Sequence, residues 1–213
     1  MLNEKRSELI GAIIGDGGIR FAPKFHQYYV EMTGNKKYER EYFQYLADLF
    51  MQEFNLTSNI REDKRALRLR VYSKDLVLWL RSFNLPYNKE KCKNIFIPEE
   101  ILKNTDFLTS CIRGITDTDG SLFFANKGYR KDYPTVEIST TSNVLAFQIR
   151  DALKDIFDFR VGFRNFTQGS FHKIYRISIN GDKMLEKWMA TIGFSNNRNF
   201  DKYRKYKSNE KWG

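Results

Sequence analysis

The chain has 213 residues, a length that suits one compact domain or two half-size ones. Lysine and arginine number 36 against 26 aspartates and glutamates, so the formal net charge is +10, which favours a polyanionic partner such as nucleic acid. Hydrophobic residues make up 41% of the chain, which excludes global disorder, but no apolar run approaches the roughly 20 residues of a membrane span. The N-terminus lacks the small-residue cleavage site of a secretory signal, so we expect an intracellular, non-secreted protein.

The two cysteines and two histidines carry little metal-binding signal. Cys92 and Cys111 form no Cys-x-x-Cys pair, and His26 and His172 lie far apart in the chain, so a structural zinc site is disfavoured. Two unpatterned cysteines suit a reducing compartment, and we expect buried free thiols rather than a disulfide. We assign neither histidine a catalytic role, because neither has the partners of a general base.

An internal repeat dominates the sequence. Residues 9–17 are Leu-Ile-Gly-Ala-Ile-Ile-Gly-Asp-Gly, and residues 112–120 are Ile-Arg-Gly-Ile-Thr-Asp-Thr-Asp-Gly. The matching positions are Gly11 with Gly114, Asp16 with Asp119 and Gly17 with Gly120, each pair 103 residues apart (114 − 11). Two copies of one motif at a constant offset indicate that one half of the chain is a structural copy of the other.

Each motif is followed by the same pattern of apolar periodicity. In the first copy we expect strands at 18–25, 27–33, 57–61 and 66–72 and helices at 37–54 and 74–83. In the second copy we expect strands at 121–126, 135–140, 160–166 and 173–179 and helices at 143–157 and 183–192. Adjacent strands favour antiparallel hairpins, so the predicted fold class is α+β: two α-β-β-α-β-β-α repeats related by a pseudo-twofold axis, with two antiparallel sheets. We place the N-terminal half at 1–85, a connector at 86–108 and the C-terminal half at 109–213.

Small residues recur four positions apart in each motif, at Gly11 and Gly15 and at Gly114 and Thr118. Four residues are about one helical turn, so these faces allow two helices to approach closely. Such packing would bring together Asp16 and Asp119, whose carboxylates are disfavoured by the helix dipoles and by each other. Divalent cations relieve this repulsion. The alternative is a plain core helix with an aspartate near its end, and it is weakened because the same motif occurs twice at matched positions. We therefore predict a Mg²⁺ site at Asp16 and Asp119, with the preceding Gly15 and Thr118 included.

The two motifs resemble the double motif of the LAGLIDADG homing endonucleases in their single-chain, two-motif form, and the resemblance covers nearly the whole chain. It implies that Asp16 and Asp119 bind the catalytic metal ions, Mg²⁺ or another divalent cation such as Mn²⁺ or Ca²⁺. It also implies that the two sheets form a saddle on double-stranded DNA and that both strands are cut across the minor groove, leaving staggered ends. Asp117 occupies the family's earlier, non-catalytic acidic position, where the first copy has Ile14, so we expect it to be dispensable for catalysis.

Several predicted strands carry basic residues on the face opposite their apolar side chains. In 66–72, for example, Leu67, Leu69 and Val71 alternate with Arg68 and Arg70. Antiparallel ribbons fit the DNA major groove, where arginine can form two hydrogen bonds with guanine, although ordinary solvated strand faces are an alternative. The predicted DNA contacts are Arg20, Lys24, Tyr29, Glu31, Thr33, Arg61, Arg68, Arg70, Lys127, Arg130, Arg164, Arg176 and Ser178.

The resemblance further implies one basic catalytic helper in each half, near the end of the closing helix. Aligning the closing helices on Trp79 and Trp188 gives an offset of 109 (188 − 79), which pairs Lys93 with Lys202. We predict catalytic roles for Lys93 and Lys202, with generic phosphate contacts as an equal alternative. Relatives commonly have a glutamine at the end of each second strand; this chain departs from that pattern, with Gly34 and Thr140 at those positions.

These features together predict a monomeric, metal-dependent, site-specific double-strand DNA endonuclease, most simply an intron-encoded one. An RNA-splicing maturase of the same fold, which would bind intron RNA without cutting, is the alternative from a different class. A DNA-binding regulator that has lost its chemistry is a third possibility. The presence of both acidic residues, Asp16 and Asp119, favours the enzyme.

Overall fold

The computed structural model describes residues 1–64, 66–88, 94–128, 130–168 and 172–210. The first half comprises α1 (Glu4–Ile14), β1 (Gly17–Ala22), a short 3₁₀ turn η1 (Pro23–Phe25), β2 (Gln27–Asn35), α2 (Arg40–Phe54), β3 (Asn59–Asp63), β4 (Ala66–Tyr72) and α3 (Lys74–Ser82). The rest comprises α5 (Glu99–Leu102), α6 (Thr105–Asp119), β5 (Gly120–Lys127), β6 (Arg130–Thr140), α7 (Asn143–Asp151), a π-helical turn η3 (Ala152–Ile156), β7 (Val161–Gln168), β8 (His172–Asn180), α8 (Asp182–Thr191) and α9 (Asn197–Glu210). The predicted α-β-β-α-β-β-α order is therefore confirmed in both halves.

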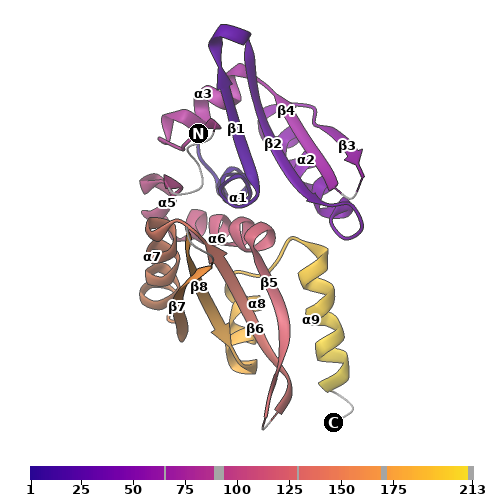
Figure 1. Ribbon diagram of the computed structural model, residues 1–213, viewed down its shortest axis with the longest axis vertical. Helices are drawn as coiled ribbons and strands as arrows, with labels where there is room; N and C mark the ends of the chain where they lie inside the picture. Colours follow the sequence, from indigo (N-terminus) through magenta and orange to yellow (C-terminus); the bar gives the residue numbers. More distant parts are fainter. Residues whose placement is uncertain (65, 89–93, 129, 169–171, 211–213) are drawn as a thin grey trace.

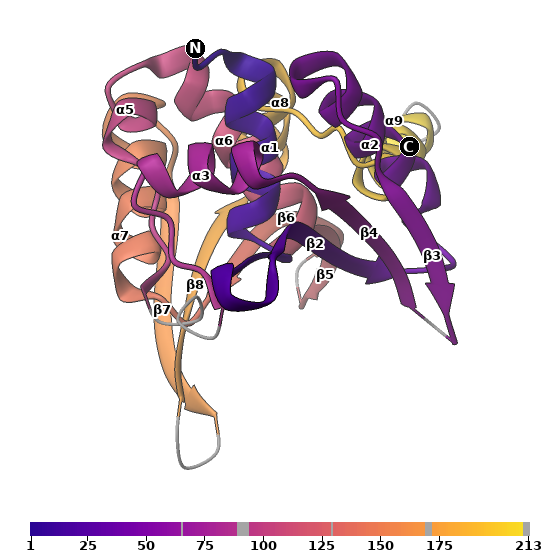
Figure 2. The same ribbon diagram turned by 90° about the horizontal axis from the view of Figure 1, so that it is seen from above.

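Each half contains a four-stranded antiparallel sheet with the same topology. The strand order is β1-β2-β4-β3 in the first sheet and β5-β6-β8-β7 in the second. Both sheets lie on the same side of a layer of helices, and their β3–β4 and β7–β8 edges point away from each other (Figures 1 and 2). The predicted α+β class with two antiparallel sheets is thus confirmed.

Local sequence accounts for where the helices begin. The side chains of Asn3, Ser73 and Ser142 accept hydrogen bonds from the amides of the first turns of α1, α3 and α7. These residues satisfy donors that a helix leaves unpaired at its N-terminus. The inward strand faces are apolar as predicted: Leu67, Leu69 and Val71 of β4 are fully buried.

The motif helices α1 and α6 pack against each other at the centre of the molecule (Figure 1). A Cβ atom on Gly11 would lie 2.1 Å from the carbonyl oxygen of Cys111, and one on Gly114 would lie 2.2 Å from that of Glu8. Only glycine permits backbones to come this close, so the predicted role of the small residues is confirmed. Cys111, at the same contact, is a buried free thiol, whereas Cys92 lies outside the described residues.

Two features differ from the expected boundaries. Helix α6 begins at Thr105, within the range that the sequence analysis gives to the connector. Helix α9 follows the second repeat and was not predicted, because its fourteen residues are mostly polar. Within the part of the chain that the structure describes, no helix has the length and apolar character needed to cross a membrane.

Candidate functional site

The C-terminal ends of the two motif helices meet between the sheets. Gly15 is the C-cap of α1, and Asp119 is the last residue of α6. A Cβ atom on Gly15 would lie 1.9 Å from Oγ1 of Thr118 and 3.4 Å from the backbone nitrogen of Asp119. Asp16, the residue after Gly15, is exposed, and Asp119 is partly exposed. The close packing of α1 and α6 therefore brings the two halves' matched segments together, with both carboxylates accessible to solvent.

Asp119 lines a cavity of about 330 Å³ together with Gly15 of the other motif. The cavity also contains Thr140, the residue at the end of β6 where relatives commonly have glutamine. Thr118 contributes differently, because its hydroxyl donates to the carbonyl oxygens of Gly114 and Ile115 at 3.0 and 3.1 Å. Of the four residues in the predicted metal site, Gly15 and Asp119 thus line one cavity, while the Thr118 hydroxyl bonds to its own helix.

The donor chemistry of this region fits a hard divalent cation. Mg²⁺ is usually held by one or two carboxylates, with water and substrate phosphates completing its shell. Among the described residues, no group of three or more histidine, cysteine, aspartate and glutamate side chains is gathered. Asp119 lines the open cavity, and Asp16 is an exposed residue next to Gly15 in its wall, so carboxylate oxygens and room for water are both present in this region.

The neighbouring acidic residue, Asp117, has a different environment. It is completely buried, and its Oδ2 accepts a hydrogen bond from the amide of Ser195 at 2.7 Å. Asn196 donates from its side chain to the Asp117 carbonyl at 2.9 Å. Burial raises the pKa of Asp117 to about 8, and the nearby Glu8 adds to the increase, while the hydrogen bond from Ser195 opposes it. Asp117 is consequently buried where Asp16 and Asp119 are accessible to solvent, and its dispensability for catalysis stays a prediction.

Lys202 lies on α9, close to the strand that follows Asp119. Its Nζ donates a hydrogen bond to the carbonyl of Leu122 at 2.8 Å, three residues beyond Asp119. Burial lowers the pKa of Lys202, and the positive charge of Arg198 lowers it further. Its predicted counterpart in the first half, Lys93, lies outside the described residues.

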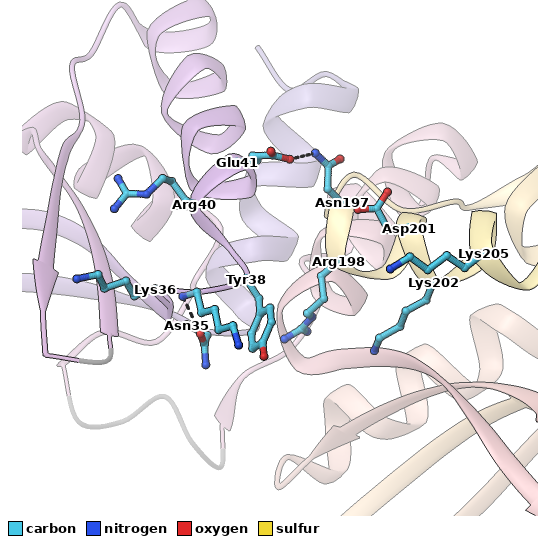
Figure 3. Close-up of a pocket in the computed structure, with 11 residues that line it drawn as sticks. Asn35, Lys36, Tyr38, Arg40, Glu41, Asn197, Arg198, Asp201, Lys202 and Lys205 are labelled. Carbon is cyan, nitrogen blue, oxygen red and sulfur yellow. Dashed lines mark hydrogen bonds between the residues drawn. The ribbon is translucent and has the colours of Figure 1, made fainter.

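A basic cleft of about 890 Å³ separates α9 from the β2–α2 region of the other half. Figure 3 shows Arg198 and Lys202 extending from α9 in the same direction, with Tyr38 near Arg198. Arg198 forms an ion pair with the buried Glu39 at 3.1 Å, which links the two halves. The residues lining the cleft are Asn35, Lys36, Lys37, Tyr38, Arg40, Glu41, Asn197, Arg198, Asp201, Lys202 and Lys205.

The outer faces of the two sheets carry arginines at corresponding positions. In the first sheet, Arg61 on β3 is paired with Arg68 on β4. In the second sheet, Arg164 on β7 is paired in the same way with Arg176 on β8. The remaining predicted DNA contacts on these outer faces are Arg20, Tyr29, Glu31, Thr33, Arg70 and Ser178. The alternation of side chains along each strand therefore correctly predicted that these residues share the outer faces of the sheets.

Three predicted DNA contacts lie away from that group. Lys24 and Lys127 are exposed near the ends of the β1–β2 and β5–β6 hairpins. The guanidinium of Arg130 forms an ion pair with Asp182 of α8 and donates to the hydroxyl of Tyr206 on α9 at 2.7 Å. The prediction that Arg130 belongs to the basic outer face is therefore corrected. The carboxylate of Asp182 and the hydroxyl of Tyr206 hold its guanidinium on the side of the sheet that faces the helices.

The sequence analysis missed the residues that join the halves through α9. Glu39 and Arg198 are an example. Ser195 and Asn196, which bind Asp117 within the C-terminal half, were missed as well. The spacing of Phe200, Tyr203 and Tyr206, three residues apart, was an available sign of a helix at this end of the chain. The partners of these residues could not be found in the same way, because they lie on distant segments.

Paired motif helices between two antiparallel sheets define the fold of the two-motif LAGLIDADG proteins, and this chain has that fold. A solved structure of mesophilic variants of the homing endonuclease I-DmoI matches 89% of this chain and 95% of its own, with a TM-score of 0.63 and 19% identity. I-DmoI in complex with DNA and Mn matches 90% of this chain and 97% of its own, with a TM-score of 0.62 and 20% identity.

The same fold occurs in full-length DUF199/WhiA from Thermatoga maritima, with a TM-score of 0.57 and 15% identity over 92% of this chain and 57% of that one. No model of a protein family matches the sequence. At these identities the likeness concerns the fold, so the function must be argued from the site itself.

Proposed function

We propose that this protein is a site-specific, metal-dependent endonuclease that cuts both strands of duplex DNA. The observation that supports the proposal is the meeting of the two motif helices, where Gly15, the residue before Asp16, packs against Thr118 and Asp119, in a molecule whose two sheets carry matched arginines. The net charge of +10 and the matched arginines favour a polyanion with twofold-related strands. Solved structures of the similar I-DmoI with DNA and Mn, and with DNA and Ca, agree with this proposal.

Each group in the site has a distinct task in this reaction. Asp16 and Asp119 would hold Mg²⁺ through carboxylate oxygens, one from each half of the chain. When bound, the metal supplies an activated water and stabilises the charge that develops on the phosphate. Lys202 would place a positive charge near the strand that follows Asp119, where it can stabilise the same charge or orient water. The arginines on the outer sheet faces hold the duplex in register.

The first test is cleavage of a randomised duplex library in the presence of Mg²⁺. We expect discrete staggered cuts at an enriched sequence, and we expect Asp16→Asn and Asp119→Asn each to abolish cutting while duplex binding persists. Asp106→Asn is a matched control, because it removes an exposed carboxylate from the opposite end of α6. Binding without cuts in Mg²⁺ or Mn²⁺ would contradict the enzyme, and binding to structured intron RNA would then support the maturase alternative.

The role of Lys202 is tested separately. Lys202→Met should slow cleavage by about a hundredfold or more, because a charge-stabilising donor near the reacting phosphate is lost. Lys205→Met removes a neighbouring, exposed lysine that lines the same cleft and should have a much smaller effect. If Lys202→Met and Lys205→Met weaken DNA binding equally and Lys202→Met does not slow cleavage of the bound duplex, Lys202 is a phosphate contact only.

A further inference from the structure

One row of residues across the outer face of the first sheet has a matching row across the second. Thr33, Arg68 and Arg61 lie in one row across the first sheet, and Ser139, Arg176 and Arg164 lie in the matching row across the second. The arginines of these rows also have matched ion pairs: Arg68 with Glu31 at 3.8 Å and Arg176 with Glu137 at 3.5 Å. In this row, each half carries one hydroxyl side chain and two arginines, so the two halves offer the same kinds of hydrogen-bond donor.

The adjacent row differs between the halves. In the first sheet it contains Glu31, Arg70 and Asn59, whereas in the second it contains Glu137, Ser178 and Gly162. Arg70 therefore occupies the position of a serine. The following row differs as well, since Tyr29 pairs with Tyr72 in the first sheet and Thr135 with Asn180 in the second.

The guanidinium of Arg70 is held in one orientation by its neighbours. Its Nε donates to Oε2 of Glu31 at 2.8 Å, and its Nη2 donates to the same oxygen. Its Nη1 donates to the hydroxyl of Tyr72 at 2.9 Å, and the guanidinium carbon lies 4.4 Å from the centre of the Tyr29 ring. The planar group is thus stacked and hydrogen-bonded before any ligand arrives, which reduces the entropy lost on binding.

Donors remain available on Arg70 despite these contacts. Each terminal nitrogen carries two N–H groups, and the contacts to Glu31 and Tyr72 use one on each. This leaves one N–H on Nη1 and one on Nη2, and two N–H groups of a guanidinium can donate to O6 and N7 of guanine in the major groove. Arg70 therefore keeps donors for a contact with a base edge.

We propose that Arg70 recognises a guanine in the half-site beneath the first sheet and that the corresponding position beneath the second sheet, faced by Ser178, has no such preference. The rows of Arg68 and Arg176 make like contacts, so the two half-sites resemble each other there and differ at the position of Arg70. This inference rests on the proposed function, because it assigns a specificity to the DNA surface of the same site.

Selection of bound duplexes from a randomised library, with wild type, Arg70→Gln and Arg70→Lys, tests the inference. Arg70→Gln should lower affinity for the selected site by roughly 5- to 150-fold and remove the guanine preference at one position of one half-site only. Arg70→Lys keeps the charge but not the fork, so it should weaken that preference while keeping the wild-type dependence of affinity on salt. The preferences elsewhere in the site should be unchanged in both variants.

Two other results would overturn the inference in different ways. A uniform loss of affinity over all sequences in Arg70→Gln, with the salt dependence reduced by about one phosphate contact, would make Arg70 a backbone contact. In that case the proposed DNA-binding function would stand. A wild-type chain that selects no duplex at all would overturn both the proposed function and this inference.

Discussion

Asp117 lies on α6, two residues before Asp119, and its side chain is shielded from solvent. In the sequence it is one of two aspartates in the second motif, distinguished by the absence of an acidic counterpart at Ile14. In the structure it is completely buried between the halves, beside Glu8 and Arg113 and under the loop that contains Ser195. Its dispensability for catalysis remains a prediction, but its burial gives it a measurable effect on stability.

The raised pKa of Asp117 makes folding sensitive to pH. Because burial raises this pKa from an ordinary value near 3.8 to about 8, the folded state retains a proton that the unfolded chain loses over that range. The contribution of Asp117 to stability is therefore complete below about pH 4 and is lost as the pH rises through 8. The loss should be at most about 1.4 kcal/mol for each pH unit in this window.

Asp117→Asn should remove this dependence, since the amide carries no charge at either pH and can still accept the hydrogen bond from Ser195. Urea unfolding at pH 5 and pH 8 provides the measurement: the variant should gain stability relative to wild type as the pH is raised. Asp106→Asn, at an exposed position of the same helix, should leave the wild-type pH dependence in place. Parallel curves for wild type and Asp117→Asn would contradict the assigned pKa.

At the scale of elements, the contact between α1 and α6 has little tolerance for added volume. A Cβ atom on Gly114 would lie 2.2 Å from the carbonyl oxygen of Glu8 and 2.8 Å from the nitrogen of Ala12. Both are backbone atoms, so the helices themselves would have to move apart. Gly114→Ala should lower the free energy of unfolding by about 3 kcal/mol, at the upper end of the usual cost of overpacking.

The matched control for that prediction is Gly128→Ala. No heavy atom lies within 4 Å of the Cβ that would be added there, at the exposed end of the β5–β6 hairpin. Its unfolding free energy should stay within about 0.5 kcal/mol of the wild-type value. Similar urea midpoints for the two variants would show that the helix contact can relax, and the predicted closeness of Asp16 to Asp119 would lose its support.

The same elements show what local sequence patterns can predict. Helices α1 and α6, the alternation in β4 and β8, and the hairpins of adjacent strands all follow from local spacings, because positions two apart in a strand and three or four apart in a helix share a face. Helix α9 was missed because its apolar positions are few and a basic tail is equally compatible with its composition. The position of the predicted Lys202 beside Leu122 depends on that helix, so the sequence could name the residue but not its surroundings.

At the scale of the whole molecule, the contacts between the halves were beyond sequence analysis. Asn197 donates a hydrogen bond to Glu41 across 156 residues of chain, and Arg198 pairs with Glu39 beside it. No local periodicity specifies such pairs, because they arise only after both repeats have folded and docked. They give α9 a structural role: it connects the C-terminal half, and with it Lys202, to the start of α2.

The pair of Glu39 and Arg198 allows this connection to be measured. Glu39 is only 6% exposed, and its carboxylate also accepts a hydrogen bond from the amide of Asn35 at 2.5 Å. Arg198→Met would leave that buried charge without its cation and should lower the free energy of unfolding by about 3 kcal/mol. Glu39→Gln in the same chain should restore part of the loss, because the uncompensated charge is then absent, so a double-mutant cycle should give a coupling energy of about 1–2 kcal/mol. Additive losses would mean that the pair of Glu39 and Arg198 does not couple the halves, which would leave the hydrogen bond from Asn197 to Glu41 as the link between the start of α9 and α2.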